Sequence, residues 1–199
     1  MSAYFTRIPF LIIVFLFAGL RSNAQHFLMP DELILQHAGS IGYLSAGAGY
    51  KLFKNERGNL DLLYGYVPAS KGGDLHIITA KFAYKPFVIK VNKLGVIYPF
   101  NPGFFLSYTP HKDLQFKFSK DNWPKGYYYW SEALRPHLSF SNEIQFSEPK
   151  FIKAAGLKSL SLYSEFNSNE WYLVNYFQNV PEVSIEDVFK LGIGVRLRF

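Results

Sequence analysis

Val188-Phe189-Lys190-Leu191-Gly192-Ile193-Gly194-Val195-Arg196-Leu197-Arg198-Phe199, the stretch on which the chain ends, decides the fold. Its odd positions, from Phe189 to Phe199, are large and apolar. Its even positions, from Lys190 to Arg198, are lysine, glycine or arginine. An alternation with a period of two is typical of a β-strand that has one apolar face and one small or charged face. The stretch therefore predicts a terminal strand with two chemically opposite faces.

Working outward, the same alternation recurs along the chain. It predicts further strands over residues 41–53, 60–66, 75–91, 96–108, 134–146 and 159–165. Pro86 disturbs the third of these near its end, and Pro99 and Pro102 predict a kink or bulge in the fourth. Residues 25–38 are ambiguous between a strand, a short helix and a plug, and we interpret Glu32–Gln36 as a strand-like lead-in. With it, the count is eight strands.

Composition narrows the fold class. Aromatic residues make up 19% of the chain, the mean hydropathy is close to zero, and no segment after residue 24 has the length and apolarity of a membrane helix. Membrane-spanning barrels carry aromatic girdles at both interfaces, and only helices and closed barrels satisfy their backbone hydrogen bonds in lipid. We therefore predict an all-β chain, a transmembrane antiparallel up-and-down β-barrel of about eight strands.

The terminal strand resembles the last strand of small bacterial outer-membrane β-barrel proteins, which ends in an aromatic residue that the barrel-assembly machinery recognises. The resemblance implies that Phe199 is a membrane-insertion signal and that the apolar faces meet lipid. It also implies two partners, the assembly machinery and the lipids of the outer membrane, including lipopolysaccharide. The expected location is the outer membrane of a Gram-negative bacterium.

The N-terminus predicts export. Arg7 precedes an apolar core from Ile8 to Leu20, and Ser22-Asn23-Ala24 supplies small residues for a cleavage site. We predict a signal peptide over residues 1–24, cleaved near Ala24, and a barrel domain over residues 25–199. The alternative is a membrane anchor, but the apolar run is shorter than the roughly 20 residues that a span needs.

The charges predict an internal polar network rather than a basic binding surface. The net charge is +6, without a basic block, so we expect no nucleic-acid partner. Buried charges must be paired, and both signs occur on the predicted inner faces. The expected members of this lumen polar network are Asp61, Lys81, Arg135, Glu143, Arg196 and Arg198.

No cofactor or metal ion is expected. The chain has no cysteine, which removes disulfides and thiolate metal sites, and its five histidines are scattered. Glycine-rich phosphate loops are absent as well. The favoured function is therefore non-enzymatic, a structural or binding role carried by the loops around residues 109–126 and 167–187. Directly after the first of these loops, Tyr127–Trp130 is expected to form an interface belt. Within the second, Trp171–Phe177 is expected to be a strand extension or a short helix.

One alternative is enzymatic. His137 and Ser139 share a predicted inner face, and Glu165 or Glu143 is available to orient the histidine, which is the arrangement for acyl transfer. This His-x-Ser pair is similar to that of the outer-membrane lipid A deacylases, and the resemblance implies catalytic roles for His137, Ser139 and Glu165. Those enzymes have asparagine directly after the serine, whereas Phe140 stands here, and they place the pair toward lipid.

A second alternative is a secreted lipocalin-like barrel. Such a barrel would reverse the two faces of every strand and enclose a ligand between its apolar side chains. The alternation itself does not distinguish inside from outside. The terminal Phe199 and a polar face rich in glycine and serine favour the membrane barrel.

Overall fold

The computed structural model describes residues 29–91, 95–114, 116, 131–146, 154, 156–179 and 182–199. Residues Asp31–Phe199 form one compact unit. The predicted signal peptide and the predicted belt at Tyr127–Trp130 lie outside the described residues and stay predictions.

Antiparallel strands make up most of the unit that ends at Phe199. They are β1 (Glu32–Ala38), β2 (Leu44–Leu52), β3 (Gly58–Val67), β4 (Leu75–Tyr84), β5 (Ile89–Val91), β6 (Gly95–Tyr108), β7 (Leu134–Phe146), β8 (Ser159–Asn169) and β9 (Lys190–Arg198). The helical elements described in this unit are η1 (Ala69–Lys71), α4 (Glu170–Gln178) and α5 (Ile185–Val188). None of the described helices is long and apolar enough to cross a membrane.

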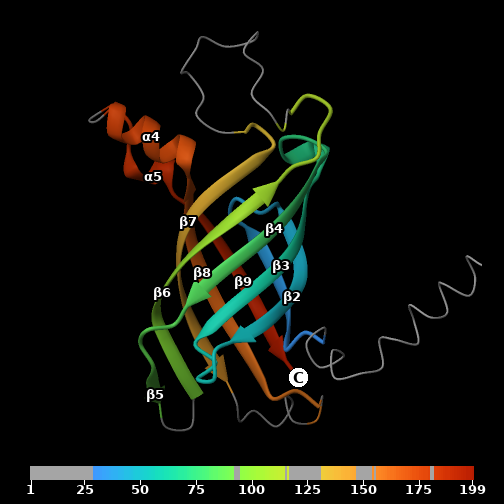
Figure 1. Ribbon diagram of the computed structural model, residues 1–199, viewed down its shortest axis with the longest axis vertical. Coiled ribbons are helices and arrows are strands. Elements are labelled where there is room, and N and C mark those ends of the chain that lie inside the picture. The colour runs from blue at the N-terminus through green and yellow to red at the C-terminus, as the bar shows by residue number, and fades with distance from the viewer. Residues whose placement is uncertain are drawn as a thin grey trace, which may run out of the picture. The chain divides into compact units, whose positions relative to one another are not determined.

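The sheet closes on itself (Figure 1). Its strands follow the order β4-β3-β2-β1-β9-β8-β7-β6-β5, and an additional pairing joins β4 to β6. The first and last strands are neighbours, because Glu32–Ala38 pairs with Arg198–Gly192. With β5 attached only to β6, eight strands make the closed circuit, and each pairs with its neighbours in sequence. The predicted all-β, antiparallel, up-and-down barrel of eight strands is confirmed.

The two ends of the barrel carry different connections (Figure 1). We call the loop end the one that holds the β1–β2, β3–β4 and β6–β7 connections and the helices α4 and α5 between β8 and β9. The turn end holds the β2–β3, β4–β6 and β7–β8 connections together with Phe199. This division follows from the antiparallel path, since the chain changes direction at every connection.

The alternation in sequence sets which side chains face inward. In β2, Leu44 is 58% exposed, whereas its neighbour Ser45 is 1% exposed. The ambiguous lead-in follows the same rule: β1 is a strand, with Leu33 and Leu35 outward and Ile34 buried inside. Ile34 packs with a few other apolar residues of the interior, among them Leu63 and Phe105. The interior is thus filled by side chains from opposite walls.

Prolines account for two departures from regular strands. The prediction of one strand over 75–91 was wrong, because β4 ends at Tyr84 and a separate β5 pairs only with β6. Pro86 lies in the interruption, where its missing N–H prevents continued pairing. The irregularity predicted in the next strand is present, as the β6–β7 register shifts between Tyr98 and Asn101, a span that contains Pro99.

Candidate functional site

Charged side chains lie inside the barrel, with as many negative as positive charges among the described residues. The described interior holds four carboxylates and four cations in mutual contact: Glu32, Asp61, Glu143 and Glu165 with Lys51, Lys81, Lys85 and Arg196. Four positive charges minus four negative charges leave this set without net charge. Charges removed from water are tolerated when they are paired and hydrogen-bonded, so this interior is a self-compensating network.

Arg196 lies at the centre of the network. Its Nη1 and Nη2 atoms donate to the two carboxylate oxygens of Asp61 at 2.8 and 2.6 Å, a bidentate pair. Nη1 also donates to Glu32 at 3.3 Å, and Nε lies 3.6 Å from a Glu143 oxygen. A planar guanidinium suits this task, because its five N–H groups serve several carboxylates at once. The last strand is thereby tied to β1, β3 and β7.

Lysines extend the network along the lumen. Lys81 lies 3.0 Å from Glu165 and 3.9 Å from Asp61, and its ammonium donates to Gln36 at 3.3 Å. Toward the turn end, Lys85 pairs with Glu143 at 2.7 Å, and Lys51 pairs with Glu32 at 2.7 Å. Each ion pair therefore joins different parts of the barrel wall, with Lys85 placed directly after the end of β4.

Tyr163 fills the space between these groups. Its hydroxyl donates to Gln36 at 2.7 Å, and the Arg196 guanidinium lies over its ring at 4.9 Å. The ring covers Gly194 on the neighbouring strand, where an added Cβ would lie 2.4 Å from it. Glycine at this position therefore makes room for the tyrosine. An eight-stranded barrel has an interior just wide enough for such filling, and here the filling is polar.

Four of the six residues predicted for the lumen polar network meet in it: Asp61, Lys81, Glu143 and Arg196. The other two lie at opposite ends of the barrel. Arg135 pairs with Glu170 at the start of α4, and Arg198 pairs with Glu56 in the β2–β3 turn at 2.6 Å. Glu32 was missing from the prediction, because the buried Ile34 breaks the alternation of its strand. The sequence did contain one indication of its inward position: Glu32 and Gln36 are four residues apart, so they lie on the same face of the strand.

The three residues of the enzymatic alternative are not assembled into a triad. His137 and Ser139 face inward, but the Nε2 atom of His137 bonds the hydroxyl of Ser107, at 2.9 Å, on β6. Glu165 is engaged by Lys81 and by Asn167. The His137 ring stacks on Phe105 with a 4.2 Å centroid distance, and its Nδ1 has no hydrogen-bond partner among the described residues.

Ser107 and His137 therefore form a buried pair without an acid. Each is 4% exposed, so the pair has little access to a substrate. A catalytic serine needs a histidine that is held by a third group and a path for the acyl donor. The sequence did not single out Ser107, because it lies on the neighbouring strand, far from the His-x-Ser motif.

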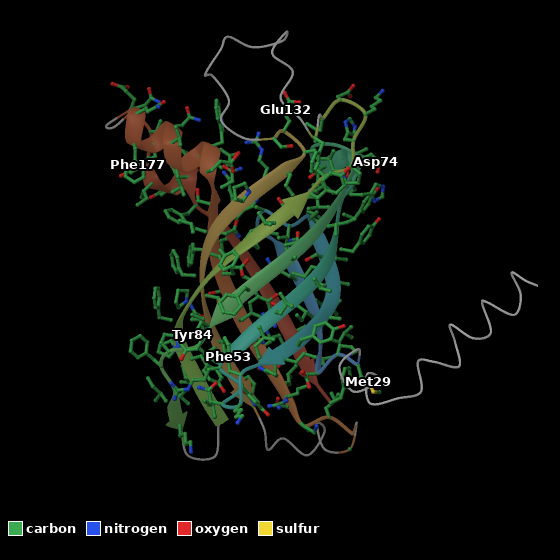
Figure 2. The ribbon with its side chains drawn as sticks, in the orientation of Figure 1. Met29, Phe53, Asp74, Tyr84, Glu132 and Phe177 are labelled. Carbon is green, nitrogen blue, oxygen red and sulfur yellow. The ribbon has the colours of Figure 1, made fainter. Side chains whose placement is uncertain are left out.

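The outer surface is apolar between two aromatic belts. At the loop end, Tyr64 and Tyr66 lie against His76, with centroid distances of 5.8 and 5.3 Å. At the turn end, Phe53 lies against Phe82 and Tyr84, and Figure 2 shows Phe53 and Tyr84 at this end of the barrel. Exposed aliphatic side chains lie between the belts: Leu33, Leu35, Leu62, Ile78, Leu106, Leu138, Ile144, Leu162, Leu191 and Ile193.

The lipocalin-like alternative is contradicted by this arrangement. It requires an apolar interior, whereas the described interior contains eight charged side chains in a network and the apolar faces point outward. A cavity for an apolar ligand has no place among these paired charges.

The loop end carries a short aromatic helix and two hollows. Asn169 caps α4 by accepting from the backbone N–H of Tyr172 at 2.9 Å. Between Leu173 of α4 and the outer faces of β6 and β7 lies an almost wholly apolar hollow of about 280 Å³. A second, of about 300 Å³, lies beside Tyr43 and Lys71. Among the described residues, no cluster of histidine, aspartate and glutamate is suited to a metal ion.

Comparisons with known proteins add one structural likeness. No protein-family model matches the chain, and no curated protein matches it in sequence. A solved structure described as "De novo design of transmembrane beta-barrels" is similar, with a TM-score of 0.39 and 12% sequence identity over 86% of this chain and 98% of that chain.

Proposed function

We propose that this chain is an integral outer-membrane β-barrel protein with a structural or binding role carried by its loop end. The observation that supports it is the reversal of the usual polarity: the charges lie inside and the aliphatic side chains outside. A soluble protein rarely exposes such a continuous apolar surface, whereas lipid covers it at no cost. The aromatic belts then lie at the two interfaces of the bilayer.

The proposal includes the orientation of the barrel in the outer membrane and the way in which the chain reaches it. In bacterial barrels the short turns face the periplasm and the longer loops face the cell exterior. The turn end, with Phe199, then faces the periplasm, and α4 and the hollow beside Tyr43 face the exterior. Residues 1–24 serve as the signal peptide, Phe199 presents the terminal strand to the assembly machinery, and lipopolysaccharide surrounds the loop end.

A non-enzymatic role is the one that the site supports. Glu165 is bound to a lysine rather than to His137, and the Ser107–His137 pair is buried without a third group. The loop end, in contrast, presents exposed side chains such as Phe177 on α4, which is 76% exposed and lies on the outside in Figure 2. Binding through these surfaces needs no rearrangement of the barrel.

Expression of the full chain in a Gram-negative host tests the proposal. We expect recovery in the outer-membrane fraction, resistance to extraction by urea, and a gel mobility that changes only after boiling, because a closed barrel stays folded in cold detergent. A matched control is the chain that lacks residues 1–24, which should stay in the cytoplasm. Recovery of the full chain as a soluble periplasmic protein would overturn the proposal.

A further inference from the structure

The outer faces of β7 and β8 carry a polar pair in the middle of the apolar surface. Asn142 and Ser164 are opposite each other in the β7–β8 register, and the Ser164 hydroxyl donates to the Asn142 Oδ1 atom at 3.2 Å. Asn142 is exposed and Ser164 is half-buried. Both belong to the face that the alternation turns away from the lumen.

Apolar side chains surround this pair on every side: Phe140 and Ile144 along β7, Leu162 and Phe166 along β8, and Ile193 across β9. Elsewhere on the described outer face, the exposed side chains between the two belts are mainly apolar, and His37 of β1, another exposed polar residue, packs edge-on against the Tyr43 ring. Two outward positions, Ile144 and Phe146, separate Asn142 from the turn end of its strand. The pair therefore lies at a depth where, in the proposed orientation, acyl chains are the surrounding medium.

The side-chain amide of Asn142 has unused hydrogen-bonding capacity. Ser164 occupies one lone pair of the Oδ1 atom, and the Nδ2 group makes no hydrogen bond to any described residue. An unpaired amide costs several kcal/mol in a hydrocarbon environment, so polar groups inside membranes face partners rather than lipid. Acyl chains offer no acceptor, and the ester groups of lipids lie near the interfaces, away from this position.

We propose that the outer face of β6–β8 is the interface with a second copy of this chain, with the two Asn142 amides hydrogen-bonded across a two-fold axis. The proposal rests on the proposed membrane function. An amide carries both donor and acceptor, so it is complementary to its own copy, and a two-fold interface needs only this one surface. Asparagine side chains hold membrane segments together in this way.

Aromatic packing on the same face supports a protein partner. Phe140 stacks on Phe166 at 5.3 Å and contacts Phe189 at 5.9 Å and Phe100 at 6.1 Å. These rings already hold each other in place next to Asn142, so a partner that packs on them restricts little further motion. Helix α4 also lies against β7 and β8, and its exposed Phe177 points outward in Figure 2.

Cysteine cross-linking in proteoliposomes tests the interface cleanly, because the natural chain has no cysteine. Ile144→Cys introduces a thiol beside the proposed axis, and Ile78→Cys introduces one on β4, outside the proposed interface. We expect a flexible bis-maleimide to produce a covalent dimer from Ile144→Cys, and only the low random level from Ile78→Cys. Equal yields from the two positions would overturn the proposal.

Substitution of Asn142 tests whether the amide itself, and not only the apolar surface around it, contributes to dimerisation. Asn142→Leu should weaken dimerisation in detergent about tenfold, measured by sedimentation, since hydrogen bonds between membrane segments contribute about 1–2 kcal/mol. Asn142→Gln keeps donor and acceptor and should keep the dimer. Leucine at an outward position should leave the barrel intact. Unchanged heat-modifiable migration of the Asn142→Leu variant would verify this.

The possible outcomes distinguish this inference from the proposed function. A chain that inserts into liposomes but stays monomeric at every protein-to-lipid ratio overturns the interface alone, as does a dimer that Asn142→Leu leaves unchanged. A chain that fails to insert overturns the membrane function itself. A monomer that carries a lipid lost in Asn142→Leu would assign the amide to lipid, and would also overturn the proposed interface.

Discussion

At the residue scale, one arginine in the barrel interior contacts three carboxylates. Arg196 is 5% exposed and contacts Asp61, Glu32 and Glu143. Removal of one member of a buried ion pair leaves the others desolvated without compensation, which is more costly than the pair is stabilising. Arg198, two residues further along the same face, lies at the rim, and its partner Glu56 is 52% exposed on its side chain.

This difference predicts unequal effects of two similar substitutions. Arg196→Ala should lower the free energy of unfolding by about 3–5 kcal/mol, because Asp61 then stays buried without its bidentate partner. Arg198→Ala should lower it by at most about 1 kcal/mol, as an exposed pair contributes little. Urea titration of the protein refolded in detergent micelles measures both. Similar losses for the two variants would contradict the central role of Arg196.

The sequence predicted that these side chains face the barrel interior, but not which residues they contact there. Alternation assigned Asp61, Lys81, Glu143 and Arg196 to one side of their strands, and the register then determined which of them meet. Register depends on the geometry of the turns and on bulges such as the one after Tyr98, which a pattern along one strand does not contain. Ser107, which lies diagonally across from His137 on β6, was missed for the same reason.

At the element scale, the barrel and the helices of the loop end differ in how they are held. None of the residues of α4 is fully buried, and the helix is fixed by its Asn169 cap and by the ion pair between Arg135 and Glu170. Each barrel strand, in contrast, is hydrogen-bonded on both sides for most of its length. The helices therefore add a surface to the barrel rather than support to its wall.

We predict that the barrel folds without most of this segment. Replacement of residues 172–186 by a short glycine-containing turn keeps Glu170, and with it the ion pair to Arg135. The variant should still show heat-modifiable migration, with a free energy of unfolding within about 1 kcal/mol of the natural chain, as expected for surface changes. A matched control that replaces the same number of residues within β8 and β9 should abolish folding. Loss of the barrel in the first variant would show that α4 supports it.

Element boundaries were predictable where alternation was strict and less so elsewhere. The strands β2, β3, β7 and β9 follow the pattern closely. The segment Trp171–Phe177 was left open between strand and helix, because its run of apolar and aromatic residues has no clear period. The structure makes it a helix, since Asn169 supplies a cap and the segment lies beyond the paired length of β8.

At the scale of the whole molecule, the lumen is closed by paired side chains. Arg196, Lys81 and Tyr163 come from different strands, and both cations lie over the Tyr163 ring in the interior. An ion that entered this network would have to break salt bridges in a region of low dielectric constant, where they are strong. We therefore do not regard the barrel as a pore.

A closed lumen predicts that the barrel does not conduct ions. The protein, delivered to a planar lipid bilayer by fusion of proteoliposomes, should produce no discrete conductance steps over a wide range of voltages. Protease protection of these proteoliposomes should verify that the protein is inserted. A large porin of known conductance serves as the positive control. Regular steps in the nanosiemens range would show that the ion-pair network opens, and would contradict a closed lumen.

The pairing of β9 with β1 has a consequence for the order of folding. Arg196 lies on β9, whereas its partners Glu32, Asp61 and Glu143 lie on β1, β3 and β7. A sheet that has not yet paired with β9 therefore holds the four carboxylates of the network against only three lysines, a surplus of one negative charge. The charges balance only when β9 pairs with β1 and β8, so closure of the ring and neutralisation of the interior are the same event.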